Sequence, residues 1–203
     1  MTTYNIPSTI KRPESLIWSL VANSVRSGNP FNNTFITATR PGTLWKVQIS
    51  WAVLTIREEG LLTSFFQSLN GMQHRVRLHD FARENGPEGN ASGTGRVMGS
   101  GQTGVSLNTD GWPINTTIFY PGDWFSVNGE LKRITNTVVS SGLGQATINF
   151  APALRSIPSD NTILDYTQPT AVFSIEDPNV SYGTPKTRLS DFSISLIEDI
   201  QES

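Results

Sequence analysis

Residues 45–51 read WKVQISW, and this stretch decides the fold. Four apolar side chains, Trp45, Val47, Ile49 and Trp51, alternate with three polar ones. Strict alternation is typical of a β-strand with one face in a core and the other in water. The stretch therefore predicts a strand in a half-solvated sheet. Both tryptophans lie on its apolar face, so we expect their rings to be core residues rather than ligand platforms.

A helix is predicted after this strand, over residues 57–70. Its apolar residues recur at helical spacing and form one stripe: Leu61, Leu62, Phe65, Phe66 and Leu69. Glu58 and Glu59 fall in the first turn, where the helix dipole favours negative charge. Gly71 supplies a stop after the last turn. We therefore expect one amphipathic helix packed on a sheet.

Strands are also predicted on either side of this pair. They span residues 16–25, 31–39 and 74–80. In the first, residues 16, 18 and 20 would face one side and residues 17, 19 and 21 the other, and in the second Phe31 and Phe35 would share a side. In the third, the side chains at 75, 77 and 79 alternate with those at 76, 78 and 80. The residues at 27–30 are Ser-Gly-Asn-Pro, which indicates a turn between the first two strands. Residues 1–16 are expected to be irregular, because two prolines interrupt them.

A change of composition at residue 86 indicates a second module. Eight glycines fall between Gly86 and Gly111, which predicts a start rich in loops. Short strands are expected next, over residues 117–120, 124–127, 130–139 and 145–150. Between the second and third of these, Asn128-Gly129 is a strong signal for a two-residue hairpin turn.

Two further strands, at residues 171–175 and 192–196, resume the pattern of the first sheet. If they pair with that sheet, the middle of the chain is an insertion. We therefore predict a mostly-β fold: a β-sandwich with one packed α-helix plus an inserted small β-barrel-like module. The first domain is expected to comprise residues 1–82 and 166–203, and the inserted module residues 83–165.

Composition and charge exclude several classes of function. The chain of 203 residues has no cysteine, so disulfides, zinc thiolate sites and thiol catalysis are excluded. Its formal net charge of −2 offers no basic face, so we expect no readout of nucleic-acid sequence. No stretch approaches ~18 consecutive apolar residues, and the N-terminus lacks the pattern of a signal peptide. We therefore expect no membrane insertion.

Short motifs of enzymes occur, but without the structural context that their chemistry needs. Residues 99–104 match G-x-G-x-x-G, yet the residues that follow would break a helix facing a pyrophosphate. Partial matches to the S-x-x-K, S-D-N and K-T-G motifs of serine β-lactam enzymes occur at Ser8-x-x-Lys11, at 159–161 and at 186–187. In that chemistry the nucleophile lies at a helix N-terminus, whereas Ser8 is predicted to lie in an irregular segment.

Titratable residues form no evident site either. The two histidines, His74 and His79, lie five residues apart on a predicted strand, so their side chains face opposite sides. No cluster of further metal ligands accompanies them. Acidic pairs occur at 58–59, 176–177 and 198–199, but a glycosidase needs two carboxylates that face one cleft. We therefore predict no catalytic residues, no cofactor and no metal site.

The order of these segments resembles the ring-forming, tail-tube-like domain of phage tail proteins. The resemblance rests on the N-terminal strands, on the helical stretch EEGLLTSFFQSLNG at 58–71 and on the strand at 74–80. The stretches YPGDWFSV at 120–127 and GQATINFAPALR at 144–155 look like the small β module of minor or distal tail proteins of long-tailed, siphovirus-like phages. The similarity covers about residues 40–200.

This resemblance implies a structural role without catalysis. Distal tail proteins form hexameric rings in the baseplate at the tail tip, and join the tail tube to the hub and the receptor-binding apparatus. We therefore expect a homo-hexameric virion protein, made in the host cytoplasm, whose partners are the tail tube protein and the hub and fibre proteins. The alternatives are a tail terminator, a head-tail connector ring, a carbohydrate-binding β-sandwich or a hydrolase.

A ring needs head-to-tail contacts that close, which favours exposed strand edges and a protruding hairpin. The predicted hairpin around residues 28–30 is flanked by apolar Val25, Phe31 and Phe35. We predict these three residues as inter-subunit contacts. The alternative is that they belong to an ordinary hairpin of the core.

Overall fold

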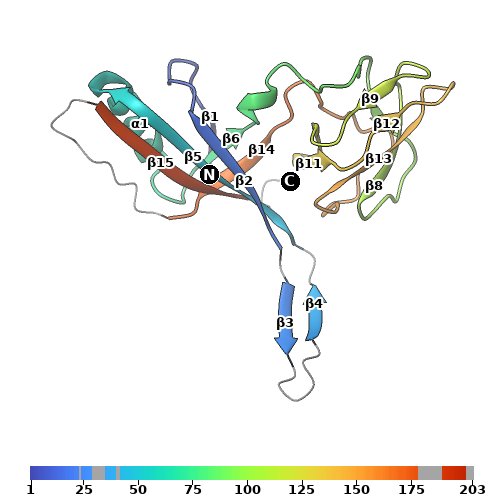
Figure 1. Ribbon diagram of the computed structural model, residues 1–203, viewed down its shortest axis with the longest axis horizontal. Helices are drawn as coiled ribbons and strands as arrows, with labels where there is room; N and C mark the ends of the chain where they lie inside the picture. The colour runs from blue at the N-terminus through green and yellow to red at the C-terminus, as the bar shows by residue number, and fades with distance from the viewer. Residues whose placement is uncertain (23, 29–34, 40–41, 178–188, 200–203) are drawn as a thin grey trace.

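The computed structural model describes residues 1–22, 24–28, 35–39, 42–177 and 189–199. They form two lobes that lie side by side and a two-stranded arm that projects away from both (Figure 1). Among the described residues strands predominate, and α1 (Ile56–Ser68) is the one α-helix. The predicted fold class, a mostly-β, sandwich-like structure with one packed helix, is therefore confirmed for the part of the chain that the structure describes.

The larger lobe is built on a six-stranded sheet with the strand order β1-β6-β14-β15-β5-β2. Its strands are β1 (Thr3–Asn5), β2 (Ser15–Val21), β5 (Leu44–Thr55), β6 (Arg75–Leu78), β14 (Ala171–Ile175) and β15 (Leu189–Glu198). Neighbouring strands are antiparallel except β1 and β6, which run parallel. The chain thus leaves this sheet after β6 and returns to it at β14. The exact division at residues 83 and 165 stays a prediction with which this topology is compatible.

Strand β5 carries the alternation of WKVQISW into the core of the larger lobe. Trp45 and Trp51 are 4% and 1% exposed, and Val47 and Ile49 are fully buried. Helix α1 (Ile56–Ser68) covers the same face, where the ring of Phe66 lies 5.9 Å from that of Trp51. Both tryptophans are therefore core residues, as predicted.

Helix α1 begins at a capping box. The Oγ1 of Thr55 accepts a hydrogen bond from the backbone N–H of Glu58, and a carboxylate oxygen of Glu58 accepts one from the N–H of Thr55 at 2.8 Å. Glu59 has a different role, because its buried carboxylate accepts a hydrogen bond from the Ser190 hydroxyl of β15 at 2.9 Å. One residue of the acidic pair therefore caps the helix, and the other fastens it to the sheet.

The smaller lobe encloses a second core between a five-stranded sheet, β10-β11-β13-β8-β7, and a two-stranded pair, β12-β9. Its strands are β7 (Arg96–Val97), β8 (Ser106–Asp110), β9 (Thr117–Phe119), β10 (Trp124–Val127), β11 (Glu130–Ile134), β12 (Val138–Val139) and β13 (Ala146–Ala151). The φ angles of Asn128 and Gly129 are 51° and 75°, as a type I′ turn between β10 and β11 requires. The predicted hairpin is therefore confirmed.

Three short strands lie where the sequence predicts none. β1 occupies the N-terminal segment that we expected to be irregular, and β7 and β8 lie in the glycine-rich stretch expected to be loop. β1 pairs with β6, and β8 pairs with β13, each distant in the chain. Pairing between distant segments depends on the tertiary structure and leaves no pattern in the local sequence.

Strands β3 (Ser24–Gly28) and β4 (Phe35–Thr39) form the arm. β3 follows the end of β2, and β4 precedes the start of β5. The arm therefore projects from the larger lobe where β2 ends and β5 begins (Figure 1). The strand predicted at 16–25 is thus divided between β2 and β3. Val25 lies on β3 and Phe35 on β4, whereas Phe31 lies outside the described residues.

Strand β5 contains a bulge whose backbone is strained. Ala52 and Val53 oppose the single residue Asp191 of β15, where the register of the two strands shifts. Val53 has a φ of 54°, in the left-handed region that β-branched residues rarely adopt. An Asp191 carboxylate oxygen accepts a hydrogen bond from the Val53 N–H at 3.2 Å, and Lys11 Nζ donates to the Val53 carbonyl at 3.0 Å. These contacts hold a conformation that costs about 1–3 kcal/mol.

Replacing Val53 with glycine is expected to stabilise the protein by about 1 kcal/mol, because glycine adopts this φ without steric strain. Val53 is 60% exposed, so the change leaves no cavity. Urea unfolding measures the effect. Val139→Gly is the matched control, since Val139 is 57% exposed on a strand and has no positive φ. It is expected to lose about 0.5–1 kcal/mol. A loss in both variants would show that the bulge is unstrained.

Candidate functional site

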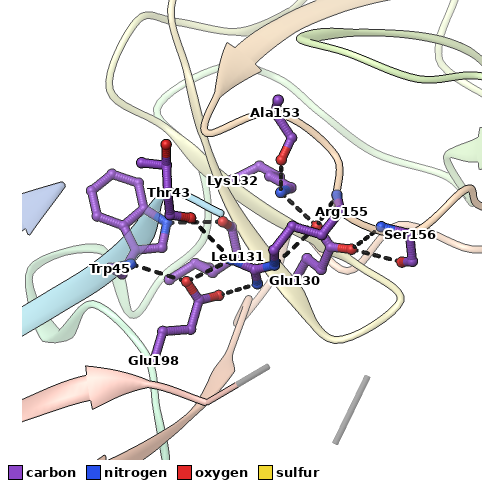
Figure 2. Close-up of polar contacts among 9 residues, drawn as sticks. All are labelled: Thr43, Trp45, Glu130, Leu131, Lys132, Ala153, Arg155, Ser156 and Glu198. Atoms are coloured by element: carbon purple, nitrogen blue, oxygen red, sulfur yellow. Dashed lines mark hydrogen bonds and ion pairs between the residues drawn. The ribbon is translucent and has the colours of Figure 1, made fainter. Parts of the chain in front are cut away.

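Four charged side chains gather where the two lobes meet: Glu130, Lys132, Arg155 and Glu198 (Figure 2). Glu130 and Lys132 lie two residues apart on β11, so their side chains share one face of the strand. They are 1% and 0% exposed, and Lys132 Nζ lies 2.6 Å from a carboxylate oxygen of Glu130. Lys132 also donates to the carbonyl of Ala153 at 2.8 Å. β11, which follows the tight turn at residues 128–129, therefore carries both partners of a buried ion pair.

The segment after β13 supplies further partners of Glu130. The backbone N–H of Arg155 donates to one carboxylate oxygen at 3.0 Å. Ser156 donates to the other oxygen through its N–H at 2.8 Å and through its hydroxyl at 2.6 Å. With Lys132, Glu130 accepts four hydrogen bonds. A buried carboxylate with this many donors is fully satisfied and remains ionised.

Arg155 links the smaller lobe to the last strand of the larger one. Its two terminal nitrogens donate to the two carboxylate oxygens of Glu198 at 2.9 and 2.6 Å, in the bidentate geometry that makes such pairs strong. Its Nε lies 3.7 Å from a carboxylate oxygen of Glu130. The guanidinium group therefore lies between one acid of each lobe.

Trp45 completes the connection between the lobes. Its backbone N–H donates to Glu198 at 3.0 Å, and its ring Nε1 donates to the carbonyl of Leu131 at 2.9 Å. The ring centroids of Trp45 and Trp124 are 4.9 Å apart. Trp124 and Leu131 come from β10 and β11 but pack in the core of the larger lobe. The four charged residues thus lie beside the apolar contact that Trp45, Trp124 and Leu131 make between the lobes. We call the four charged residues and this apolar contact together the junction.

The pKa values of the network follow from burial and pairing. Burial would raise the pKa of Glu130, but hydrogen bonds from Lys132 and Ser156, the Lys132 charge and the Arg155 N–H together hold it below its usual value. Burial lowers the pKa of Lys132, although Glu130 opposes that shift. Burial alone would lower the pKa of Arg155, but the hydrogen bonds and the negative charge of Glu198 outweigh this effect and raise it. Two acids and two bases compensate one another, so the network fixes the lobes without a net charge.

The arm and the outer edge of the sheet form a second candidate site. β2 is the last strand of the six-stranded sheet, so no described strand pairs with its outer edge. Ile17, Leu20 and Val21 on this strand are 54%, 42% and 43% exposed. Of the predicted contacts, Val25 and Phe35 lie on the arm that continues from β2 and β5, and Phe31 lies beyond the described residues. Apolar surface therefore accompanies an unpaired edge at the base of the arm.

The histidines are placed apart. The His74 ring packs edge-on against Tyr4, with ring centroids 5.6 Å apart. The His79 ring lies 4.5 Å from that of Phe81, and burial lowers the pKa of His79. Within the described residues, no group of three or more His, Asp or Glu side chains could hold a metal ion.

The enzyme-like motifs fall on structural contacts. Residues 99–104 form a loop that leads into β8 rather than into a helix. Lys11 binds the bulge of β5, whereas Asp160 accepts a hydrogen bond from the N–H of Gly99 in the smaller lobe. Lys186 and Thr187 lie outside the described residues. The absence of enzyme activity nevertheless stays a prediction.

Comparison with known proteins identifies no relative: no protein-family model matches the chain, and no curated protein matches it significantly. Within the described residues, no helix is long and apolar enough to cross a bilayer.

Proposed function

We propose that the chain is a structural subunit of a phage tail tip, and that it forms a homo-hexameric ring between the tail tube and the hub and receptor-binding proteins. The observation that supports this proposal best is the projecting arm of β3 and β4 together with the outer edge of β2, with which no described strand pairs (Figure 1). The confirmed mostly-β fold with one helix is compatible with it.

A ring of identical subunits needs two different surfaces that meet head to tail. Monomeric proteins normally protect an outer strand with charged residues or proline, because an open edge pairs with other chains. β2 reads SLIWSLV at residues 15–21 and contains neither. Its exposed apolar side chains are therefore available for a neighbouring copy. The arm, which extends beyond the lobe, is the element able to reach that neighbour.

The junction supports the same role. Bidentate pairing of Arg155 with Glu198 and the packing of Trp124 against Trp45 fix the smaller lobe on the larger one. A subunit whose lobes keep one orientation presents the same outer surface six times around a ring. We propose that the smaller lobe decorates the outside of the ring and that the six-stranded sheet forms its body.

The test is the oligomeric state of the purified protein, measured by native mass spectrometry and light scattering. The expected particle has about six times the chain mass of 22.3 kDa. The double change Ile17→Lys and Val21→Lys is expected to shift the population from rings to monomers, because both side chains point to one face of the edge strand and lysine blunts such edges.

Val139→Lys is the matched control for this experiment, since Val139 is 57% exposed, more than either substituted residue of β2, but lies on β12 of the smaller lobe. It is expected to leave the assembly unchanged. All three lysine substitutions are at exposed positions, so the thermal midpoint of unfolding should stay within a few degrees. A wild-type protein that remains monomeric at high concentration, and forms no ring on tails seen by cryo-electron microscopy, would overturn the proposal.

A further inference from the structure

Two adjoining cavities lie where the smaller lobe meets the outer face of the six-stranded sheet. Their volumes are about 300 and 530 Å³, and both are lined by Arg77, Asp165 and Thr170. Arg77 stands on β6 between Asn5 of β1 and Val172 of β14, and all three face away from the apolar core of the sheet. We call these two cavities the groove. Their size is within the range of small-molecule sites.

Arg77 is the cation of the groove that is available to a ligand. It is exposed, and it makes no ion pair with any described residue. The other arginine of the groove, Arg155, is already bound to Glu198 and Glu130. Asp199, which also lines the groove, pairs with Arg75. The guanidinium of Arg77 therefore offers its donors to an anionic group that enters the groove.

The other polar side chains of the groove include His79 and six neutral hydrogen-bonding groups, and apolar residues such as Ile6 and Ile163 line it as well. The six are Asn5, Ser126, Asn128, Thr167, Gln168 and Thr170. Asp165 adds an acceptor, and its Oδ1 is already engaged by the N–H and hydroxyl of Thr167. At one end the partly exposed ring of Phe81 lines the wall. Such a surface matches a molecule that presents many hydroxyl groups and one negative charge.

We propose that this groove binds a saccharide that bears a carboxylate, with the carboxylate on Arg77 and the hydroxyl groups on the amide and hydroxyl side chains around it. A polyphosphate would need more than one free cation. An extended peptide would need an open strand edge or apolar side-chain pockets, and the groove lies over the face of the sheet instead. One chain supplies every residue of the groove, so a single subunit can bind the saccharide without forming a ring.

The experiment measures binding by isothermal titration calorimetry and by saturation-transfer NMR on the full chain. The probes are 3′-sialyllactose and methyl β-glucuronide, each with a single carboxylate, with lactose and methyl β-glucoside as their neutral partners and polyglutamate as an acidic peptide. We expect both acidic saccharides to bind at millimolar concentration, and the neutral partners to bind at least roughly tenfold more weakly, since charge-assisted hydrogen bonds are about twice as strong as neutral ones. Affinity should fall as salt is raised.

Arg77→Gln is expected to weaken binding of the acidic saccharides by roughly tenfold or more and to remove its dependence on salt. Arg57→Gln is the matched control, because Arg57 is an exposed arginine on α1, which packs on the opposite face of the sheet from the groove, and it makes no ion pair among the described residues. It should bind as the wild type does. Gln168→Ala keeps the charge of the groove and is expected to weaken both acidic and neutral saccharides alike.

Three results would overturn the proposal: no saccharide binding by wild-type protein at these concentrations, equal affinity of the wild type and Arg77→Gln, or tighter binding of polyglutamate than of the saccharides. The thermal midpoint of each variant shows whether it is folded. If Arg77→Gln failed to fold, a salt-independent affinity of the wild type would decide against the proposal. Oligomeric state plays no part in these outcomes, so ring formation and saccharide binding are tested separately.

Discussion

Replacing Lys132 with methionine is expected to lower the free energy of unfolding by about 3–5 kcal/mol, the usual consequence of removing one partner of a buried ion pair. Lys132 is 0% exposed, and its ammonium group lies 2.6 Å from Glu130. Methionine has a similar length, so the cavity is small, but the Glu130 carboxylate then lies in the interior without its nearest cation. Urea unfolding followed by tryptophan fluorescence measures the loss.

A double-mutant cycle separates this electrostatic effect from packing. Glu130→Gln in the Lys132→Met background removes the unpaired charge, so the double variant is expected to be more stable than the sum of the two single losses implies. Lys46→Met is the matched control, because Lys46 forms a pair with Glu176 in which both side chains are more than a third exposed. Its expected cost is about 0–1 kcal/mol. Equal losses at Lys132 and Lys46 would show that burial of the network contributes nothing.

The sequence predicts those elements whose signal is local. The period of two in WKVQISW places Trp45 and Trp51 in the core, and the helical stripe places α1 within one or two residues of its observed start and end. Asn128-Gly129 fixes the hairpin of β10 and β11. Each of these signals follows from backbone geometry over a few residues, and tertiary packing then selects the same face that the pattern indicates.

The junction and the groove have no such local signal. The sequence predicts ELKRI at residues 130–134 only as a hairpin strand, and nothing local indicates that Glu130 and Lys132 are buried. Their burial depends on Arg155 and on Glu198, which lies 43 residues beyond Arg155. The acidic pair at 198–199 falls at a strand end in the sequence. Only the return of β15 to the first sheet brings Glu198 to Arg155.

The arm shows an intermediate case. The strands predicted at 16–25 and 31–39 overlap β2, β3 and β4, whereas Asn29 and Pro30 of the turn predicted between them lie outside the described residues. The division between β2 and β3 is not predicted, because no proline or glycine marks it in the sequence. A pattern of period two fixes which side chains share a face. It does not state whether the partner strand belongs to the sheet or to a projecting pair.

Replacing Glu198 with alanine is expected to cost about 3–5 kcal/mol and to loosen the smaller lobe from the larger one. The change removes the bidentate partner of Arg155 and leaves the buried N–H of Trp45 without an acceptor. An orphaned buried donor alone costs about 1–3 kcal/mol. Glu198→Gln keeps one acceptor oxygen and is expected to lose less.

Hydrogen exchange distinguishes this variant from the one at Lys132. Loss of Glu198 is expected to raise amide exchange in β10, in β11 and at the end of β15, because these segments meet at the junction. Strands β8 and β13, which pair with each other inside the smaller lobe, should keep their protection. Glu176→Gln, which breaks the exposed pair with Lys46, is the control and should leave exchange unchanged. Uniform exchange throughout both lobes of Glu198→Ala would mean that they unfold as one cooperative unit and that the junction is no separable joint.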